Sequence, residues 1–474
     1  MATDVNRRTF VAGTAGAAAT AYALGGPITA FAAKTKQDKK RPKAAGYGPL
    51  RPTPEQDSGK VYLQLPVGFK YRLINRAGAP MRNGLPTPGI FDGMGAYAGP
   101  GGTTVLIRNH ENRSRTGEVT VPVPTGKRYD PDVAVRGGNT KLVVSKDRRL
   151  ESVFPVLGGT HTNCAGGETP WGTWITCEEI FNYGSAENNV APGTGVPHGY
   201  CFEIDAAANG PVTPQPILDA GRFSHEAVAW LKGSLYETED RGDACFYRFI
   251  PEREPKEAGD LATFGGTLWA LAVKGRPNLN GNTANPGETY PVEWVRIEEP
   301  NPLDDTVRKE AQSKGAMVFD RTEGIWTAGN SVYFDCTTGG DARLGQLWQY
   351  TPKGQWGGEL KLIYESTDLQ DLENPDNLVI VPDTGDVFLQ EDSSNEQYVR
   401  GVTKNGLIYD FAKAVLNTTE FCGGCFSPDG KTFFLNQQGD RLALGETETS
   451  QPDSKAGLTF AIWGGFDGRD EKAL

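Results

Sequence analysis

The stretch Gly233-Ser234-Leu235-Tyr236-Glu237-Thr238-Glu239-Asp240 contains the pattern that decides the fold of this chain. A glycine turn leads into a short strand with apolar and aromatic residues, and the strand ends at acidic residues. The same order recurs from Gly385 to Asp392 and from Gly172 to Glu179. This repetition predicts many short strands, several of which close on a carboxylate.

The rest of the chain favours strands over helices. It has 60 glycines and 32 prolines among 474 residues, which favours frequent turns. Helical periodicity is scarce, and residues 304–314 form one weak helix candidate. We expect an all-β fold in which sheets repeat radially, as in a β-propeller; a pair of β-sandwiches is the alternative. Further predicted strands cover residues 104–108, 173–176, 331–335, 386–390 and 431–436.

The charge balance argues against a nucleic-acid surface. The formal net charge is -11, whereas binding to phosphate backbones needs a basic patch. Hydrophobic residues make up 38% of the chain and aromatic residues 10%, which is enough for a buried core. An acidic balance fits a chain that retains carboxylates for hard metal ions, and it fits an ordinary acidic surface equally well.

The N-terminus resembles an export signal. Arg7-Arg8-Thr9-Phe10 is followed by an Ala/Gly-rich apolar stretch from Val11 to Leu24, and Ala30-Phe31-Ala32 has the form of a cleavage site. We interpret residues 1–33 as a twin-arginine (Tat) signal peptide, and a Sec signal with a chance arginine pair is the alternative. The stretch is too short for a stable membrane span.

This interpretation sets the expected domains and location. Residues 34–59 are predicted to be a linker or extended arm, and residues 60–474 a single β-propeller catalytic domain. The Tat translocase is the expected partner during export. The mature protein is then expected to be secreted, associated with the cell wall or periplasmic. No feature of the sequence points to an obligate partner, so we expect a monomer.

The chain contains an odd number of cysteines. In an oxidising compartment, an odd count leaves at least one thiol unpaired or coordinated. Cys164 is the candidate, because it lies in the polar, glycine-rich stretch from Thr160 to Gly167, where a thiolate could bind a metal. The other six could form up to three disulfides. For Cys422 and Cys425 a small local disulfide is favoured over two free buried thiols. The seven cysteines are Cys164, Cys177, Cys201, Cys245, Cys336, Cys422 and Cys425.

The candidate site residues are mostly carboxylates. With only 4 histidines in the chain, a three-histidine zinc site is poorly supported. Oxygen ligands suit calcium, magnesium and ferric iron. Carboxylates buried together need cations, so the predicted carboxylates either diverge on the surface or are held by metal ions. They lie in the segments Asn109–Glu111, Thr176–Glu179, Ser224–Ala227, Glu237–Asp240, Asp320–Gly324, Gln390–Asp392 and around Glu420 and Asp429.

Three consecutive motifs bear a family resemblance. Asn163-Cys164-Ala165-Gly166-Gly167, then Thr169-Pro170-Trp171-Gly172-Thr173-Trp174, then Thr176-Cys177-Glu178-Glu179 resemble the signature of PhoX-type alkaline phosphatases. Asn-His-Glu at 109–111 and His-Glu-Ala at 225–227 follow the order of that family. The resemblance spans roughly residues 60 to 440, most of the predicted mature chain.

The resemblance implies a six-bladed propeller that hydrolyses phosphomonoesters at a cluster of Fe3+ and Ca2+ in its central opening. Arg321 and Cys164 are the implied catalytic residues, with Arg321 binding the substrate phosphate. A guanidinium suits this role because its planar fork matches phosphate oxygens. The implied iron ligands are Cys164, Glu179, Glu226 and Glu323, and the implied calcium ligands are Glu111, Glu239, Asp240 and Glu391.

The sequence also departs from the family pattern. Arg321-Thr322-Glu323 stands where the family has Arg-Pro-Glu, and Gln437-Gln438-Gly439-Asp440 stands where many members have Gln-His-Pro-Gly. Two other functions therefore stay open beside a phosphatase with a small-molecule phosphoester substrate. One is a non-catalytic, calcium-stabilised propeller that binds a partner. The other is a propeller hydrolase that acts on a lactone or phosphotriester.

Overall fold

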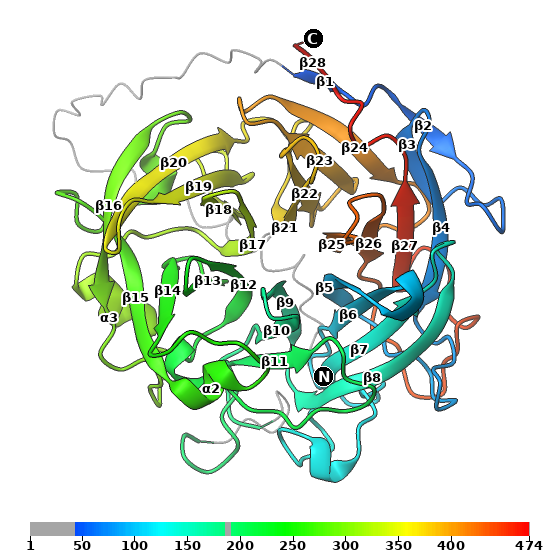
Figure 1. The fold of residues 1–474 in the computed structure, drawn as a ribbon, viewed down its shortest axis with the longest axis horizontal. Coiled ribbons are helices and arrows are strands. Elements are labelled where there is room, and N and C mark those ends of the chain that lie inside the picture. The colour runs from blue at the N-terminus through cyan, green and yellow to red at the C-terminus, as the bar shows by residue number, and fades with distance from the viewer. Residues whose placement is uncertain (1–42, 185–190, 474) are drawn as a thin grey trace, which may run out of the picture. The chain divides into compact units, whose positions relative to one another are not determined.

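The structure is a computed structural model that describes residues 43–184 and 191–473. The predicted signal peptide, residues 1–33, lies outside the described residues. In the described part, β-sheets are arranged in a ring around a centre (Figure 1). The helices there are short: α2 (Asp260–Phe264), α3 (Val307–Ser313), and the 3-10 turns η1 (Pro100–Gly102), η2 (Thr125–Lys127), η3 (Leu218–Ala220) and η4 (Gly281–Thr283).

Three of the sheets are small and antiparallel. One contains β5 (Phe91–Ala98), β6 (Thr104–His110), β7 (Gly137–Val144) and β8 (Leu150–Thr160). The next contains β9 (Asn163–Glu168), β10 (Thr173–Glu178) and β11 (Cys201–Asp205). In the third, β25 (Phe421–Phe426), β26 (Phe433–Gln437) and β27 (Leu458–Trp463) are completed by the early strand β4 (Lys70–Arg76). Because β4 pairs with β27, an early strand and a late strand close the ring together.

Two sheets are larger. A six-stranded sheet has the order β2 (Leu50–Thr53), β3 (Leu63–Pro66), β24 (Ile408–Ala414), β23 (Tyr398–Val402), β22 (Val387–Glu391) and β21 (Pro375–Ile380). A nine-stranded sheet has the order β12 (His225–Leu231), β13 (Ser234–Glu239), β14 (Tyr247–Pro251), β15 (Gly266–Val273), β16 (Thr289–Arg296), β20 (Gly357–Glu365), β19 (Gln346–Pro352), β18 (Ser331–Cys336) and β17 (Thr322–Ala328). A small sheet joins β1 (Ala44–Gly46) to β28 (Asp470–Ala473).

The prediction of an all-β chain is confirmed, and the sheets have a propeller-like arrangement. They do not separate into six distinct units, however. Strand β16 pairs with β15 on one side and with β20 on the other, which merges two sets of strands into the nine-stranded sheet. Such a pairing joins segments far apart in the sequence and leaves no local signal.

Several sequence-based expectations fall on observed elements. The weak helix candidate at residues 304–314 contains α3. Residues 43–59, assigned to a linker or extended arm, include β1 and β2, which pair with β28 and β3. None of the helices in the described residues has the length and hydrophobicity that a membrane span requires.

Aromatic rings of the hydrophobic core join the two sets of strands that make up the nine-stranded sheet. Phe246, just before β14, stacks on Phe334 of β18 with ring centroids 4.3 Å apart, and Phe334 stacks in turn on Trp348 of β19. All three side chains are buried. Burying one such ring stabilises the fold by roughly 2–3 kcal/mol. These contacts hold the sheets, and with them the strands near the centre, in fixed positions.

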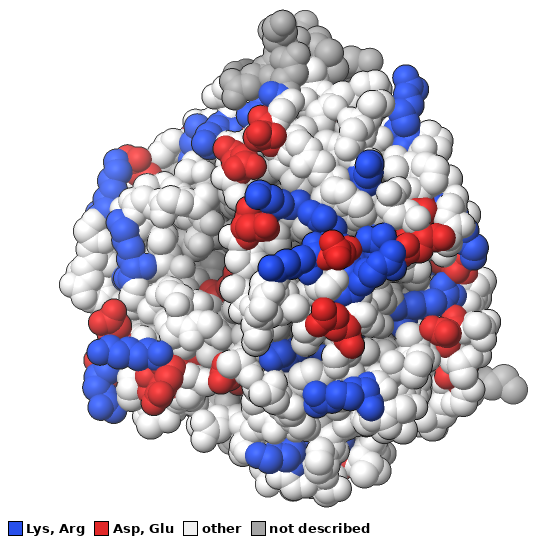
Figure 2. Space-filling model, turned by 45° about the vertical axis from the view of Figure 1, so that its right-hand side comes forward, with Lys and Arg blue, Asp and Glu red and all other residues white. Residues whose placement is uncertain are grey.

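The surface carries mixed charge. On the face in Figure 2, acidic and basic side chains lie among one another. Among the described ion pairs, Arg72 and Arg149 both contact Asp57, at 2.7 and 3.0 Å. Basic side chains that are paired in this way do not build the uniform positive patch that nucleic acid requires.

Candidate metal centre

One strand from each part of the ring lies nearest its centre (Figure 1). These strands contact one another in the cyclic order β5, β9, β12, β17, β21, β25 and back to β5. In each strand the second residue is buried, and each of these residues carries a carboxylate or a thiol. They are Asp92, Cys164, Glu226, Glu323, Asp376 and Cys422.

The residue that follows each of these positions is Gly, Ala or Asn, and it lines a narrow central cavity. The small size is required, because a Cβ on Gly93 would lie 2.5 Å from the Cα of Ala165 in the neighbouring strand. Gly423 also needs the absence of a side chain, since its φ is +61°. Small residues therefore let the six strands approach closely and bring their second side chains together.

Bulges help to set the direction of these side chains. The register of β12 with β13 shifts between His225 and Val228, which brackets Glu226. The register of β17 with β18 shifts in the same way between Thr322 and Ile325, which brackets Glu323. A bulge re-aims a side chain and interrupts the ladder locally. Asp92 and Asp376 lie within similar shifts, and Cys422 directly precedes one.

The carboxylates and Cys164 form four overlapping groups, and within each group the potential ligand atoms lie within 4.8 Å of one another. Cys164 belongs to two groups, Glu226 to two and Asp376 to two, so the groups are continuous. They are Asp92–Glu111–Cys164, Cys164–Glu179–Glu226, Glu226–Glu323–Asp376 and Asp376–Asp392–Glu420.

Burial dominates the electrostatics of the cluster. It raises the pKa of the Glu226 carboxyl well above its ordinary value, and the neighbouring carboxylates of Glu323 and Glu179 raise it further. Burial and the nearby Asp92 likewise raise the pKa of the Cys164 thiol, which donates to Asp92 Oδ2 over 3.6 Å. Neither oxygen of Glu226 has a hydrogen bond among the described residues. Carboxylates in such surroundings are stabilised by cations.

Two guanidinium groups contact the cluster. Arg113 lies 2.5 Å from Glu111, and Arg321 lies 2.5 Å from Glu323. Arg321 also donates from Nε and Nη2 to the two oxygens of Asp240, at 2.7 and 2.9 Å. Its side chain keeps a relative exposure of 24%, so part of it reaches the surface.

A side-chain amide bridges three of the carboxylates. Gln438 Nε2 donates to Glu111 over 2.7 Å and to Asp92 over 3.3 Å, and it also contacts Glu420. Gln438 follows β26 directly and is one of the residues at which the sequence departs from the expected Gln-His-Pro-Gly run. It therefore links the group around Cys164 to the group that contains Glu420.

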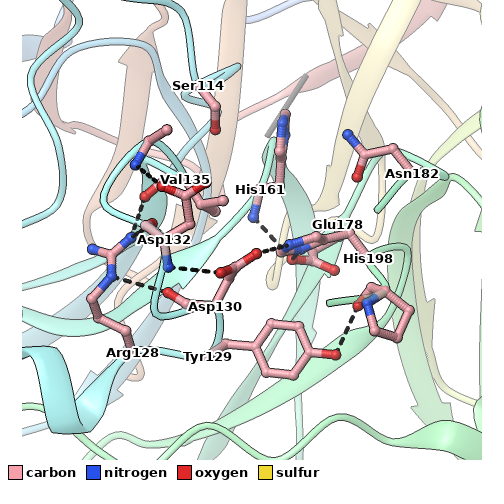
Figure 3. A network of polar contacts seen from close by, with 12 residues as sticks. Ser114, Arg128, Tyr129, Asp130, Asp132, Val135, His161, Glu178, Asn182 and His198 are labelled. Atoms are coloured by element: carbon pink, nitrogen blue, oxygen red, sulfur yellow. Dashed lines mark hydrogen bonds and ion pairs between the residues drawn. The ribbon is translucent and has the colours of Figure 1, made fainter. Parts of the chain in front are cut away.

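The network in Figure 3 supports the segment between Cys164 and Glu179. Glu178 accepts from the backbone N–H of His161 over 2.9 Å and lies 2.7 Å from His198 Nδ1. Burial lowers the pKa of His198, but the carboxylates of Glu178 and Asp130 outweigh it and raise that pKa to about 9. This network fixes Glu178, and hence the position of Glu179, which follows it.

Comparison with known proteins assigns the family. The chain matches the family Alkaline phosphatase PhoX over residues 45–156 and 150–440. The chain belongs to the PhoX alkaline phosphatase family. This membership confirms the sequence-based resemblance and identifies the chain as a PhoX-like alkaline phosphatase.

Among solved structures, PhoX from Pseudomonas fluorescens, in complex with vanadate as a transition state analogue, has the same fold. It is 18% identical, the match covers 88% of this chain and 98% of that one, and the TM-score is 0.64. A more distant match is XC5397 from Xanthomonas campestris, a gluconolactonase, at 10% identity, 90% and 98% coverage and a TM-score of 0.42. No curated protein sequence matches the chain.

In this PhoX-family chain, the structure brings together five of the eight residues predicted as metal ligands. These five are Glu111, Cys164, Glu179, Glu226 and Glu323. The other three, Glu239, Asp240 and Glu391, are absent from the four groups. Asp240 binds Arg321 instead, so the predicted phosphate-binding arginine lies at the edge of the cluster, through its contact with Glu323.

Glu239 and Glu391 contact groups outside the cluster. Glu239 accepts from the Tyr247 hydroxyl over 2.8 Å and lies 3.5 Å from Arg308. Glu391 accepts from Arg400 Nε over 2.9 Å and from two backbone N–H groups. Both carboxylates are directed at neighbouring loops and strands of their own sheet. The residue after Glu391, Asp392, belongs to the cluster instead.

Sequence reasoning missed Asp92 and Asp376 as site residues. It searched for carboxylates at the ends of strands, whereas Asp92 and Asp376 stand one residue inside the start of β5 and β21. The available signal was an acidic residue or cysteine followed directly by Gly, Ala or Asn at the start of a strand. That signal recurs at Cys164, Glu226 and Glu323.

All seven cysteines, each in the described part of the chain, are free and buried. The local disulfide favoured for Cys422 and Cys425 is not formed. Cys422 donates to the carbonyl of Phe91 over 3.1 Å, whereas Cys425 packs into a hydrophobic cluster with Phe434. The two thiols thus have different surroundings within β25.

Proposed function

We propose that this protein hydrolyses phosphomonoesters at a metal centre built on the six strands around the middle of the ring. The observation that carries the proposal is the continuity of the four ligand groups, in which Cys164, Glu226 and Asp376 are each shared by two. Shared ligands are what a multinuclear cluster requires, because one residue then contacts more than one ion.

The donor set fits the ions expected for the family. Cys164 with Asp92, Glu111, Glu179 and Glu226 offers one thiolate and several carboxylates, a combination suited to Fe3+. The groups Glu226–Glu323–Asp376 and Asp376–Asp392–Glu420 offer oxygen alone, which suits Ca2+. The buried and unpartnered oxygens of Glu226 supply an independent reason for a cation at this point.

When bound, these cations would offset the negative charge that builds on phosphoryl oxygens during hydrolysis. The chain's own residues bind and orient the substrate. Asp240 binds Nε and Nη2 of Arg321, and Arg321 would present the remaining edge of its guanidinium to phosphate oxygens. Arg113 places a second positive charge beside Glu111 at the same cluster.

We further infer that the ring is a six-bladed propeller. Strands β12–β15 and β17–β20 are each antiparallel and sequential, as are β5–β8, and β16 alone joins the first two sets. With β9–β11, β21–β24 and the sheet of β25–β27 with β4, this division gives each of the six inner strands a sheet of its own. The site then lies in the central opening.

We also propose that residues 1–33 direct export by the Tat translocase, that residues 34–59 lead into the propeller and that residues 60–474 form the catalytic domain. The twin arginines at 7 and 8 and the cleavage-site pattern at residues 30–32 support this export route. The protein is then secreted, attached to the cell wall or periplasmic. Sequencing the N-terminus of the exported protein tests the route, and a retained Met1 would contradict it.

Substrate class is tested by turnover of the full chain on a phosphomonoester, a phosphotriester and a lactone under identical conditions. We expect the phosphomonoester to be hydrolysed with the highest kcat/KM, because a monoester offers Arg321 at least two unesterified phosphate oxygens, whereas a triester offers one and a lactone has no phosphate. Faster turnover of the lactone or the triester would overturn the proposal. Calcium without iron and without turnover would instead favour a binding function.

A further inference from the structure

A second group of potential ligands lies outside the central cluster. Cys201, His225 and Glu237 are all buried, and their ligand atoms lie within 4.8 Å of one another. Cys177 adjoins them, with its Sγ 3.6 Å from that of Cys201. None of these four residues belongs to the groups around Cys164, Glu226 and Asp376, and the proposed phosphatase function does not use them.

The histidine of this group has the orientation of a metal ligand. His225 Nε2 lies 3.1 Å from the carbonyl oxygen of Gly221, which only accepts, so Nε2 carries the proton. Nδ1 then presents its lone pair toward Cys201 Sγ and Glu237 Oε2, each 3.3 Å away. Phe223 stacks on the imidazole at 3.7 Å and fixes the plane of the ring. A ring nitrogen that binds a backbone carbonyl while the other faces the metal is the usual arrangement of metal-bound histidine.

The carboxylate of Glu237 has no other partner that would explain its burial. Its side chain has a relative exposure of 0%, and neither oxygen has a hydrogen bond among the described residues. Glu237 Oε2 lies 3.3 Å from His225 Nδ1, and the lone pair of that nitrogen does not neutralise a carboxylate.

The separations match those in a tetrahedral zinc site. Zinc–sulfur distances of about 2.3 Å and zinc–nitrogen or zinc–oxygen distances of about 2.0–2.2 Å place ligand atoms about 3.3–3.8 Å apart. The observed separations are 3.6 Å between the two sulfurs and 3.3 Å from Nδ1 to Cys201 Sγ and to Glu237 Oε2. Thiolate, imidazole and carboxylate together are ligands that zinc accepts.

We propose that Cys201, His225 and Glu237 bind a structural Zn2+. Cys177, whose Sγ lies 3.6 Å from that of Cys201, is the adjoining thiol that would turn toward the ion as a fourth ligand on binding. The two cysteines lie opposite each other on β10 and β11, whereas His225 and Glu237 lie on β12 and β13 of the next sheet. The ion therefore joins two sheets. Its position also fixes the strands from which Glu179 and Glu226 reach the central cluster. The site is closed to solvent, as structural zinc sites are.

The test is the metal content of the full-length, exported protein and of matched variants. Wild type is expected to contain stoichiometric zinc in addition to its other metals. Glu237→Gln, which keeps the size of the side chain and removes a buried charge, is expected to lose most of the zinc and to keep its iron and calcium. Cys201→Ala is expected to do the same. Cys245→Ala removes a buried thiol from the same hydrophobic cluster and serves as the control that retains zinc.

Cobalt provides a readout that separates this site from Cys164. In a Cys164→Ala background, Co2+ is expected to give thiolate charge-transfer absorption, which the added Cys201→Ala change removes. Absence of zinc from wild type even after incubation with zinc would overturn the proposal. So would a Glu237→Gln protein with the zinc content of wild type. A Cys177–Cys201 disulfide in unreduced peptide maps would also overturn it, because a disulfide cannot supply the thiolates.

Discussion

The guanidinium of Arg321 holds both carboxylate oxygens of Asp240, with Nε 2.7 Å from Oδ1 and Nη2 2.9 Å from Oδ2. Arg321 is also a non-glycine residue with φ of +57°, and its backbone N–H donates to the carbonyl of Arg241 over 2.9 Å. The backbone and the guanidinium of Arg321 are therefore both held in place before substrate binds. This relationship connects the sequence-predicted phosphate-binding residue to the edge of the cluster.

Replacing Arg321 with Lys tests whether activity requires the planar guanidinium. Lys keeps the charge but cannot bind two oxygens in a plane, so we expect kcat/KM for a phosphomonoester to fall by about 10–100-fold. Steady-state kinetics at fixed metal content measure this change. Asp240→Asn is the companion variant, in which Arg321 is less firmly oriented, and we expect mainly a higher KM. Equal kinetics in wild type and Arg321→Lys would remove the arginine from the site.

We expect Glu226→Gln to have opposite effects on the metal-free protein and on the metal-bound enzyme. Its carboxylate is buried with Glu323 and Glu179 nearby, so without metal the change removes like-charge repulsion and a desolvation cost. We expect the chelator-treated variant to be more stable than chelator-treated wild type by about 1–3 kcal/mol. With metals supplied, we expect the variant to bind less iron and to lose activity. Denaturant unfolding with and without chelator measures both effects, and a variant that is less stable in both conditions would contradict this account.

Glu391→Gln tests whether Glu391 braces the fold or binds metal. The carboxylate accepts from Arg400 Nε and from the backbone N–H groups of Glu373 and Tyr398. Losing these charge-assisted hydrogen bonds is expected to lower the free energy of unfolding by about 2 kcal/mol, while the metal content stays unchanged. Calcium analysis of the folded variant decides the point. Loss of calcium at wild-type stability would restore Glu391 as a ligand.

Glu168 predicts a dependence of stability on pH that is independent of the cluster. It lies at the end of β9, burial raises its pKa to about 7, and the N–H of Ala96 donates to it over 2.7 Å. A carboxyl whose folded pKa is raised stabilises the protein below its unfolded pKa, and this contribution is lost as the pH rises through the folded pKa. Wild type should therefore lose up to about 3 kcal/mol between pH ~4.5 and pH ~8 through this residue.

Glu168→Gln is the matching variant, because an amide oxygen can still accept from Ala96. Chemical denaturation at about pH 5 and about pH 9 is the measurement. We expect Glu168→Gln and wild type to be similar in stability at the lower pH, and the variant to be the more stable of the two at the higher pH. A constant difference across the range would show that the carboxyl has an ordinary pKa in the folded protein.

The sequence was sufficient to predict the strand content and much of the cluster. Cys164 and Glu179 belong to a continuous motif that is specific enough to assign, and Glu226 and Glu323 each lie near the start of a strand in a segment that the sequence singled out. Adjacent residues of a strand point to opposite sides, and a bulge changes which of them faces the centre. Choosing Asp392 rather than Glu391 as the residue of this pair that faces the cluster therefore required the structure.

Contacts between strands that are far apart in the chain could likewise not be predicted from the sequence. Asp92 in β5 and Asp376 in β21 are far apart in the sequence, and the short local signal at each does not show that their strands meet at one centre. The joining of β15 to β20 through β16 also depends on segments that are far apart. Cys201 lies in one sheet, and His225 and Glu237 lie in another. Their spacing in the sequence therefore gave no sign that the three side chains meet.

The most direct test of the central claim is iron and calcium analysis of the exported protein, measured beside phosphomonoester turnover in wild type, Cys164→Ala and Cys425→Ala. Cys425 is a buried thiol outside the ligand groups and so controls for the loss of a buried sulfur. The metal-centre account predicts that wild type and Cys425→Ala contain iron and calcium and hydrolyse the phosphomonoester, whereas Cys164→Ala loses both iron and turnover. Wild-type turnover in Cys164→Ala, or full turnover in wild type that contains no iron, would contradict it.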